Sequence, residues 1–175
     1  FSQIPIPRKH TFLMTSRLLK DKGVNEYVEA AKIIKKIYPN TIFYLAGSLD
    51  SNPNSISQNQ LKRWIDDGVI NYLGFVSPIQ KAIIKCRYFV LPSYYPEGLP
   101  RSILEAMASG RPIITTNKPG CIDTVLENKN GFLIQPRNID NLVEKMLKLI
   151  SLEEQIVQKM GRCSRELVKN NFEIG

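Results

Sequence analysis

The chain has 175 residues, 43% of them hydrophobic, so it is long enough to bury one substantial core and short for two independent domains. No apolar run approaches the roughly 20 residues that a membrane-spanning helix needs, and the first residues lack the apolar segment of a signal peptide. The formal net charge of +8 favours anionic partners: phosphorylated small molecules, acidic membrane surfaces or nucleic acid. These properties predict a soluble protein.

Three cysteines, Cys86, Cys121 and Cys163, are widely spaced and lie in apolar or helical stretches. An odd number at this spacing predicts neither a disulfide framework nor a zinc site. Buried, reduced thiols are the expected state, which agrees with a cytoplasmic location.

Short runs of β-branched and aromatic residues alternate along the chain with segments of helical period. The runs predict buried strands at 11–16, 41–47, 69–74, 88–92, 112–116 and 131–134. Helices are predicted between them at 24–38, 59–67, 78–86, 101–110 and 121–127. Strands that alternate with helices form a parallel sheet. The predicted fold is therefore α/β, a Rossmann-like doubly wound parallel sheet of about six strands with helices on both faces.

The whole chain, 1–175, is predicted to form a single domain. Residues 1–10 contain prolines and are predicted to be an extended lead-in from a preceding domain. Residues 137–175 are predicted to form C-terminal helices. Asn138 is placed to cap the first of them, and Ser151, with a glutamate three residues later, has capping-box spacing for the second.

The loop after the first predicted strand, SRLLKDKG, contains Arg17 and Lys22. Ligands of parallel α/β sheets bind beyond the carboxyl ends of the strands, so such loops are informative. A guanidinium and an ammonium in one loop can converge on the same phosphate groups. The alternative is that both are ordinary surface cations, and this loop by itself does not decide.

The loop after the fourth predicted strand leads into a helix through EGLPRS. Gly98 permits close approach of a ligand, and Pro100 suits the first helical turn, which leaves the amides near Arg101 free to bind an anion. Glu97 precedes the turn and Glu105 lies about one turn inside the helix, so the two carboxylates can hold different parts of one extended ligand. Alternatively, both glutamates interact only with the helix dipole.

The segment EGLPRSILEAMASGRPIITT resembles the signature of the retaining glycosyltransferases called family 4, whose members have two Rossmann-like domains in the GT-B arrangement. SRLLKDKG, GFVS at 74–77 and NKNGFLI at 128–134 are similar to further motifs of that family. The resemblance extends from about Thr11 to Val168. It implies the C-terminal, donor-binding domain of a family 4 enzyme (glycosyl transferases group 1) of the type that builds bacterial surface polysaccharides such as capsule or lipopolysaccharide.

Position by position, the resemblance implies a site for a nucleotide-diphosphate sugar. Arg17 and Lys22 would bind the diphosphate, Glu105 the ribose hydroxyls, and Glu97 the sugar. Glu97, Arg17 and Lys22 are the expected catalytic groups, with Glu97 orienting the sugar and not acting as a covalent nucleophile. The full expected donor-binding set is Arg17, Lys22, Gly47, Val76, Glu97, Gly98, Leu99, Pro100, Arg101 and Glu105.

Two further points qualify this resemblance. The segment AGSLD at 46–50 lacks the second glycine that many members carry after the first, so the family pattern does not describe this loop. The family needs no metal ion or other cofactor, because cationic side chains and helix amides offset the charge of the leaving diphosphate.

The implied reaction transfers a hexose or N-acetylhexosamine to a surface-glycan or lipid-linked acceptor, with UDP-sugars favoured as donors and GDP-sugars as the alternative. In a GT-B enzyme the acceptor site belongs to an N-terminal domain, so this chain alone is expected to bind donor and to be almost inactive. A lipid-linked acceptor would bring the enzyme to the inner face of the cytoplasmic membrane, in agreement with the net charge of +8.

Two other hypotheses stay open at this point. A GT-B sugar-nucleotide epimerase would use similar contacts, but it needs catalytic acids and histidines that the sequence lacks. A non-catalytic module that binds anions or nucleic acid would use the basic faces, and its affinity would survive the loss of Glu105 and fall steeply with salt. The absence of Gly-x-Gly-x-x-Gly after the first strand and of a Walker-type Gly-Lys-Ser/Thr disfavours dehydrogenases and phosphate-loop NTPases. We expect no nucleic-acid partner.

Five further side chains have structural interpretations. His10, the only histidine, is expected to be an exposed structural residue, which leaves no basis for a catalytic triad or a metal site. Trp64 is expected to pack within a helix. Ser93, Tyr94 and Tyr95 either line the sugar pocket or pack at the end of a strand, and the sequence does not choose.

Overall fold

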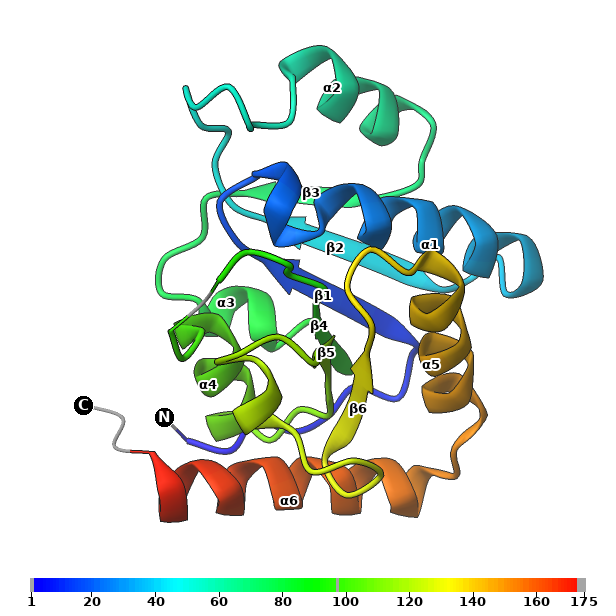
Figure 1. Ribbon diagram of the computed structural model, residues 1–175. Helices are drawn as coiled ribbons and strands as arrows, with labels where there is room; N and C mark the ends of the chain where they lie inside the picture. The colour runs from blue at the N-terminus through cyan, green and yellow to red at the C-terminus, as the bar shows by residue number, and fades with distance from the viewer. Residues whose placement is uncertain (1, 97, 173–175) are drawn as a thin grey trace.

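The computed structural model describes residues 2–96 and 98–172, which form a six-stranded sheet flanked by helices (Figure 1). All neighbouring strands pair in parallel, in the order β3-β2-β1-β4-β5-β6. The strands are β1 (Thr11–Thr15), β2 (Ile42–Ala46), β3 (Asn71–Gly74), β4 (Tyr88–Leu91), β5 (Ile113–Thr116) and β6 (Gly131–Ile134). Each of them falls within a predicted run, so the strand predictions are confirmed.

The helices follow the predicted order with bounds that differ by up to three residues, and the helix predicted at 121–127 is only a short 3-10 helix. They are α1 (Val24–Ile37), α2 (Gln58–Asp66), α3 (Gln80–Ile83), α4 (Arg101–Ala108), α5 (Ile139–Ser151) and α6 (Glu154–Asn171), with short 3-10 helices η1 (Lys20–Lys22) and η2 (Ile122–Thr124). In α1, Val24, Val28, Ala31 and Ile34 recur at helical spacing and are buried. Tyr38, the last residue of the predicted helix, lies beyond its end and is 44% exposed.

The direction of sheet growth reverses between β1 and β4. From β1 the sheet extends to β2 and β3, and from β4 it extends the other way to β5 and β6. Because connections between parallel strands are right-handed, this reversal puts α1 and α4 on opposite faces. α5 then packs against α1, and α6 against α4. The doubly wound fold is confirmed, and the loops after β1 and β4 diverge at the point where such folds bind ligands.

The core covers both faces of the sheet. Every residue of β1, β4 and β5 is buried, as expected for central parallel strands with helices on either side. Phe12 stacks on Phe43 of the neighbouring strand, with ring centroids 5.1 Å apart, and its centroid lies 4.8 Å from that of Tyr88 on the other neighbour. These rings join the two halves of the sheet across β1.

Residues 2–10 of the N-terminal lead-in contain no helix or strand and are held by a buried arginine, Arg111. The Nη1 atom of Arg111 donates to the carbonyls of Ile4 at 2.7 Å and Ser109 at 3.1 Å. Its Nη2 atom donates to Pro5 at 3.1 Å and Ile83 at 3.3 Å. One side chain thereby ties the lead-in to the segments before β4 and β5.

A second buried arginine, Arg87, fixes the end of the lead-in. It donates to the Pro7 carbonyl at 2.8 Å and to the Tyr88 hydroxyl at 2.9 Å, and it pairs with Glu154 at 2.6 Å. His10 Nδ1 lies 2.9 Å from the same hydroxyl. His10 is therefore a structural residue as predicted, but it is half-buried and not exposed. Burial, reinforced by the charge of Arg87, lowers the pKa of His10.

The start of α6 differs from the prediction. Ser151 is the last residue of α5 and caps nothing, while Glu153 takes the N-cap position of α6 without a side-chain hydrogen bond. The capping box does not form because Ser151 still belongs to α5, where its hydroxyl donates to the Lys148 carbonyl at 2.7 Å, and the carboxylate of Glu154 pairs with Arg87 instead. Asn138 caps α5 as predicted, accepting a hydrogen bond from the amide of the third helical residue at 2.8 Å.

The cysteines are free. Cys86 and Cys121 are buried and Cys163 is half-buried, so full burial holds for two of the three. Burial raises the pKa of the Cys86 thiol to about 11, which keeps it protonated at neutral pH.

Trp64 packs within α2 with 4% of its surface exposed, as predicted.

Within residues 2–96 and 98–172, no helix is long and apolar enough to cross a bilayer.

Candidate functional site

A cleft of about 900 Å³ opens at the carboxyl edge of the sheet, where the strand order reverses. The loops after β1, β2, β3 and β4 and the start of α4 form its walls. The cleft brings together seven of the residues predicted from the sequence: Arg17, Lys22, Gly47, Val76, Pro100, Arg101 and Glu105.

Arg17 and Lys22 lie on the loop between β1 and α1, which contains η1. The Arg17 side chain is 61% exposed, and Lys22 Nζ lies 4.7 Å from the ring centroid of Tyr95. Gly23 follows η1 with φ 85°, and a Cβ there would lie 2.2 Å from the carbonyl oxygen of Pro92. Glycine at this position thus allows the loop that carries both cations to pack against the end of β4.

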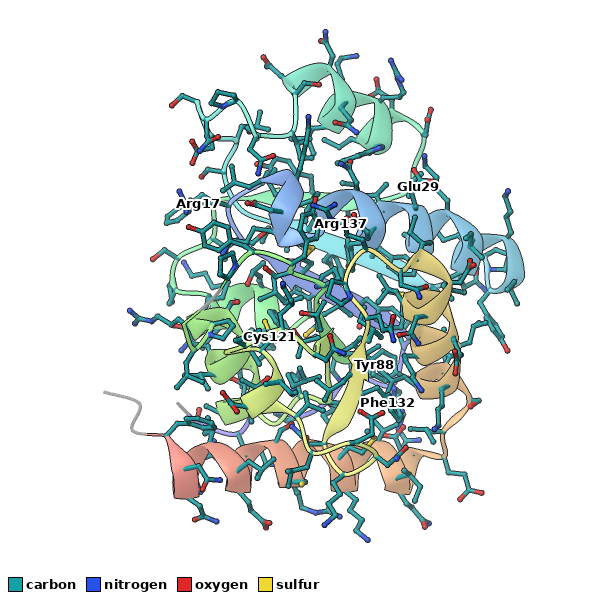
Figure 2. All side chains as sticks on the ribbon, viewed as in Figure 1. Arg17, Glu29, Tyr88, Cys121, Phe132 and Arg137 are labelled. Carbon is teal, nitrogen blue, oxygen red and sulfur yellow. The ribbon has the colours of Figure 1, made fainter. Side chains whose placement is uncertain are left out.

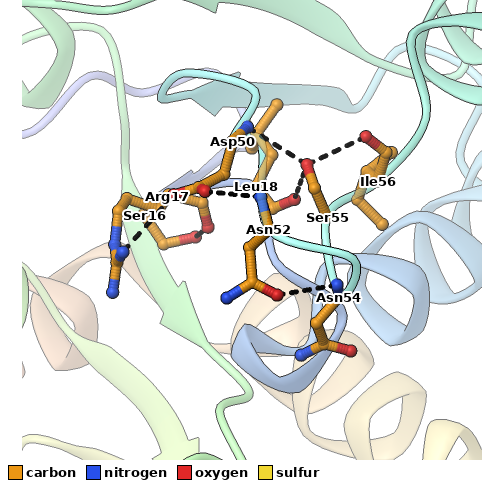
Figure 3. Close-up of polar contacts among 8 residues, drawn as sticks. All are labelled: Ser16, Arg17, Leu18, Asp50, Asn52, Asn54, Ser55 and Ile56. Atoms are coloured by element: carbon orange, nitrogen blue, oxygen red, sulfur yellow. Dashed lines mark hydrogen bonds and ion pairs between the residues drawn. The ribbon is translucent and has the colours of Figure 1, made fainter.

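The segment 47–56, which departs from the family pattern, is ordered by hydrogen bonds to the loop after β1. Leu18 N donates to the Ser48 carbonyl at 3.0 Å, and Ile56 N donates to the Leu18 carbonyl at 2.8 Å. Side chains of the same segment add further bonds, drawn in Figure 3. These contacts hold the two loops together as one wall of the cleft.

Gly47 lies where the loops after β1 and β2 meet. It has φ 139°, and a Cβ on it would lie 1.7 Å from the Ser16 carbonyl oxygen. Its amide donates to the Gly74 carbonyl at 2.8 Å, and its carbonyl accepts from the Tyr72 hydroxyl. No residue with a side chain fits between these groups, which explains a glycine at this point of the cleft.

The start of α4 forms the facing wall. Pro100 occupies the N-cap position, one residue earlier than the first-turn position predicted for it. The amides of Arg101 and Ser102 have no acceptor within the helix, and both residues line the cleft, so the helix start can bind an anion. The carboxylate of Glu105, with a side chain 13% exposed, accepts from Arg101 Nε at 3.1 Å. A ligand hydroxyl that binds Glu105 would either share its carboxylate with Arg101 or displace Arg101 from it.

The loop after β3 adds an aromatic ring that the sequence did not single out. Val76 lines the cleft as predicted, and so does its neighbour Phe75, which is 77% exposed. An exposed ring at the mouth of a cleft offers a flat apolar surface to a planar ligand group such as a nucleotide base.

Three predicted residues do not line the cleft as described. Glu97 lies outside the described residues. Gly98 and Leu99 are exposed, and a Cβ on Gly98 would meet nothing within 4 Å, so space beside this backbone is open. In the described part of the chain, no group of three or more His, Cys, Asp or Glu residues could hold a metal ion.

A cluster of Glu26, Tyr94 and Arg137 supports the loop after β4, and nothing in the sequence pattern revealed it. The Arg137 guanidinium lies over the Tyr94 ring, 4.3 Å from its centroid, beside the start of α1 (Figure 2). The amides of Tyr94 and Tyr95 both donate to the Asp21 carbonyl at 2.9 Å. Tyr94 and Tyr95, like the buried Ser93, are absent from the cleft lining, which favours the packing interpretation.

Within this cluster the Glu26 carboxyl is in an unfavourable environment for a charge. Its Oε2 atom is buried without a hydrogen-bond partner among the described residues. Burial raises the pKa of Glu26, against the smaller opposing effects of its own backbone and of Arg137. A raised carboxyl pKa favours the protonated form in the folded state, so folding is penalised progressively as pH rises from about 4.5 through the raised pKa.

Glu26→Gln is therefore expected to raise the melting temperature at pH 7.5, with a gain that shrinks as pH falls toward 4.5. Melting curves of both proteins over this range measure the effect. Glu29→Gln, which removes an exposed carboxylate from the same helix, is the control and should change stability by less than about 0.5 kcal/mol. A lower melting temperature for Glu26→Gln at pH 7.5 would mean that attraction by Arg137 outweighs the cost of burial.

Comparison with known proteins identifies the family. The family model for glycosyl transferases group 1 matches residues 1–166. The chain is 34% identical over 154 residues to the N,N'-diacetylbacillosaminyl-diphospho-undecaprenol alpha-1,3-N-acetylgalactosaminyltransferase of Campylobacter jejuni, covering 88% of this chain and 39% of that protein.

Two solved structures show the same fold. The C-terminal domain of the glycosyl transferase group 1 family protein LpcC from Francisella tularensis superposes with a TM-score of 0.79 at 26% identity, covering 97% of this chain and 89% of that one. HepE from Anabaena, in complex with UDP, gives a TM-score of 0.81 at 22% identity, covering 94% of this chain and 45% of that one.

The chain spans less than half the length of the curated relatives that it matches, 39% of the Campylobacter enzyme and 40% of the capsular glycosyltransferase CapM of Staphylococcus aureus. The family match, in contrast, extends over residues 1–166 and includes the cleft. The chain belongs to the glycosyl transferases group 1 family.

Proposed function

We propose that this chain is the donor-binding domain of a retaining glycosyltransferase and that a nucleotide-diphosphate sugar occupies the cleft. The proposal is carried by the convergence of two cationic side chains, a helix start and a carboxylate on one cleft, contributed by Arg17, Lys22, Arg101, Ser102 and Glu105. Cations and helix amides suit the diphosphate, and a carboxylate suits the ribose hydroxyls. A volume of about 900 Å³ is within the range of small-molecule sites.

The chemistry requires the bond between the sugar and the diphosphate to break, with the diphosphate leaving as an anion. Arg17, Lys22 and the amides at the start of α4 would offset the negative charge as it develops. Glu97 would orient the sugar through hydrogen bonds and would not attack it. With these groups in place the reaction needs neither a metal ion nor another cofactor.

The proposed donor carries a hexose or N-acetylhexosamine, on UDP in preference to GDP, and the proposed acceptor is a surface glycan or a lipid-linked saccharide. The name of the Campylobacter relative, with its diphospho-undecaprenol acceptor, supports a lipid-linked acceptor. In this proposal the acceptor binds through a second domain, and the enzyme works at the cytoplasmic face of the membrane. The 175-residue chain alone is then expected to bind donor and to show almost no turnover.

Nucleotide binding by the 175-residue chain tests the proposal. UDP or GDP at about 100 times its Kd should raise the free energy of unfolding by about 2.7 kcal/mol. Arg17→Ala combined with Glu105→Ala should abolish this gain, because charge-assisted hydrogen bonds contribute about 1.5–3 kcal/mol each, or roughly 10- to 100-fold in Kd per residue. Thermal unfolding with a nucleotide panel, followed by calorimetry, measures both.

The matched control is Arg162→Ala combined with Glu166→Ala, which removes the same two charges from exposed positions on α6. This variant should bind nucleotide like the unmodified chain. The donor-site proposal fails if neither UDP nor GDP binds. It fails in favour of a polyanion-binding module if nucleic acid binds instead, with an affinity that survives the loss of Glu105 and falls steeply with salt.

A further inference from the structure

The Arg17 guanidinium, which faces the cleft, already has an anionic partner in the protein. Arg17 Nη1 lies 3.4 Å from Oδ2 of Asp50, and the side chains are 61% and 23% exposed (Figure 3). Asp50 belongs to the segment after β2 that departs from the family pattern, and it is not among the residues expected to bind donor. Any anion that binds Arg17 does so in the presence of this carboxylate.

Asp50 is held in place without the help of Arg17. Its Oδ1 accepts from Asn52 N at 2.9 Å, and its own amide donates to Ser55 Oγ at 3.1 Å. Asn52 repeats the first arrangement by accepting from Asn54 N at 2.8 Å. Such Asx turns are local and need no distant partner. One carboxylate oxygen thus fixes the loop, while the other is directed at the arginine.

We propose that Asp50 competes with the donor diphosphate for Arg17 and so limits how tightly the site holds a nucleoside diphosphate. This inference rests on the proposed function. The competition is modest, because an ion pair this exposed changes an equilibrium by up to about fivefold. When the nucleoside diphosphate leaves, Asp50 replaces it as the anionic partner of Arg17, which assists its departure. Asp50 acts on the ligand through Arg17 and is a positioning residue.

Asp50→Asn removes the negative charge and keeps the loop structure, because the amide oxygen of asparagine can still accept a hydrogen bond from Asn52 N. The expected result is a two- to fivefold lower Kd for UDP, measured by calorimetry at about 50 mM salt, with a smaller change at high salt as screening increases. Uridine, which has no phosphate, should bind Asp50→Asn and the unmodified chain equally. If the role of Asp50 were purely structural, the substitution would change the Kd for UDP and for uridine alike.

A double-mutant cycle tests whether the effect passes through Arg17. In an Arg17→Gln background, Asp50→Asn should change the UDP Kd by less than about 1.5-fold, since the competing pair no longer exists. Asn52→Ala, which removes the second Asx turn and no charge, is the matched control and should not tighten UDP binding. Melting curves without ligand establish that each variant is folded.

The outcomes distinguish this inference from the proposed function. If the unmodified chain binds neither UDP nor GDP, both fail. If UDP binds and Arg17→Gln weakens it, but Asp50→Asn leaves UDP binding unchanged or weaker, the donor site stands and the competition is refuted. The competition is also refuted if Asp50→Asn lowers the UDP Kd equally in the Arg17→Gln background, because the effect would then come from the overall charge of the site. It is refuted as well if Asn52→Ala lowers the UDP Kd, because the effect would then come from a looser loop.

Discussion

Replacing Arg111 by methionine is expected to lower the free energy of unfolding by about 2–4 kcal/mol, since a hydrogen bond from a charged group contributes about 1.5–3 kcal/mol. Arg111 has no exposed surface, and its guanidinium donates to four carbonyls. The carbonyls of Ser109 and Ile83 keep a backbone donor without it, whereas those of Ile4 and Pro5 depend on the guanidinium among the described contacts. Methionine fills much of the volume but supplies no donor.

The same substitution should release the lead-in. The amide of Ile4, which donates to the Ser109 carbonyl at 3.3 Å, should exchange with solvent faster in Arg111→Met, as followed by hydrogen exchange. Chemical denaturation measures the loss of stability. Arg162→Met, at an exposed position on α6, is the control and should change stability by less than about 0.5 kcal/mol. An equally small effect at Arg111 would show that water replaces the guanidinium at no cost.

Gly47→Ala is expected to destabilise the fold by about 3 kcal/mol, the upper part of the range for overpacking, and to abolish binding of nucleotide in the cleft. A Cβ at this position would lie 1.7 Å from the Ser16 carbonyl oxygen, with the backbone at φ 139°. Relief of the clash requires the loops after β1 and β2 to separate. That movement carries Arg17 away from the wall formed by α4, so the site loses its geometry even where the chain still folds.

Gly68→Ala is the matched control for the strained backbone. Gly68 also has a positive φ, 70°, but a Cβ there would meet nothing within 4 Å. Gly68→Ala should therefore cost about 1 kcal/mol from backbone strain alone and leave UDP binding unchanged. Melting curves and calorimetry compare the two variants. Unchanged UDP binding in a folded Gly47→Ala variant would contradict the argument that the close approach at Gly47 shapes the cleft.

The strands were predictable because central parallel strands must be apolar on both faces. A run such as residues 88–92 has no polar alternation and is short, which distinguishes it from a helix. The order of the strands then placed Arg17 and Glu105, 88 positions apart in the sequence (105 − 17), beside one cleft. The family motifs located these residues in advance because the site is assembled from loops at fixed places in the fold.

Side-chain partners were predicted less well. The capping box at Ser151 failed although its spacing is correct, because α5 continues through Ser151 and a buried arginine far away in the sequence pairs with the glutamate. The predicted exposure of His10 failed for a related reason, since the hydroxyl of Tyr88 reaches it from β4. Local sequence patterns indicate which interactions a side chain can make. Which of them it does make also depends on partners that are distant in the sequence.

The sequence by itself determined the doubly wound sheet, its six strands, and seven of the residues that line the cleft, because burial and backbone geometry leave signals at short range. Only the tertiary structure decided which partners the charged side chains meet. Arg17 pairs with Asp50 across 33 positions, and Arg111 reaches Ile4 across 107. Such pairings depend on which loops the sheet order brings together and on which groups are removed from water, and neither is encoded in the spacing of neighbouring residues.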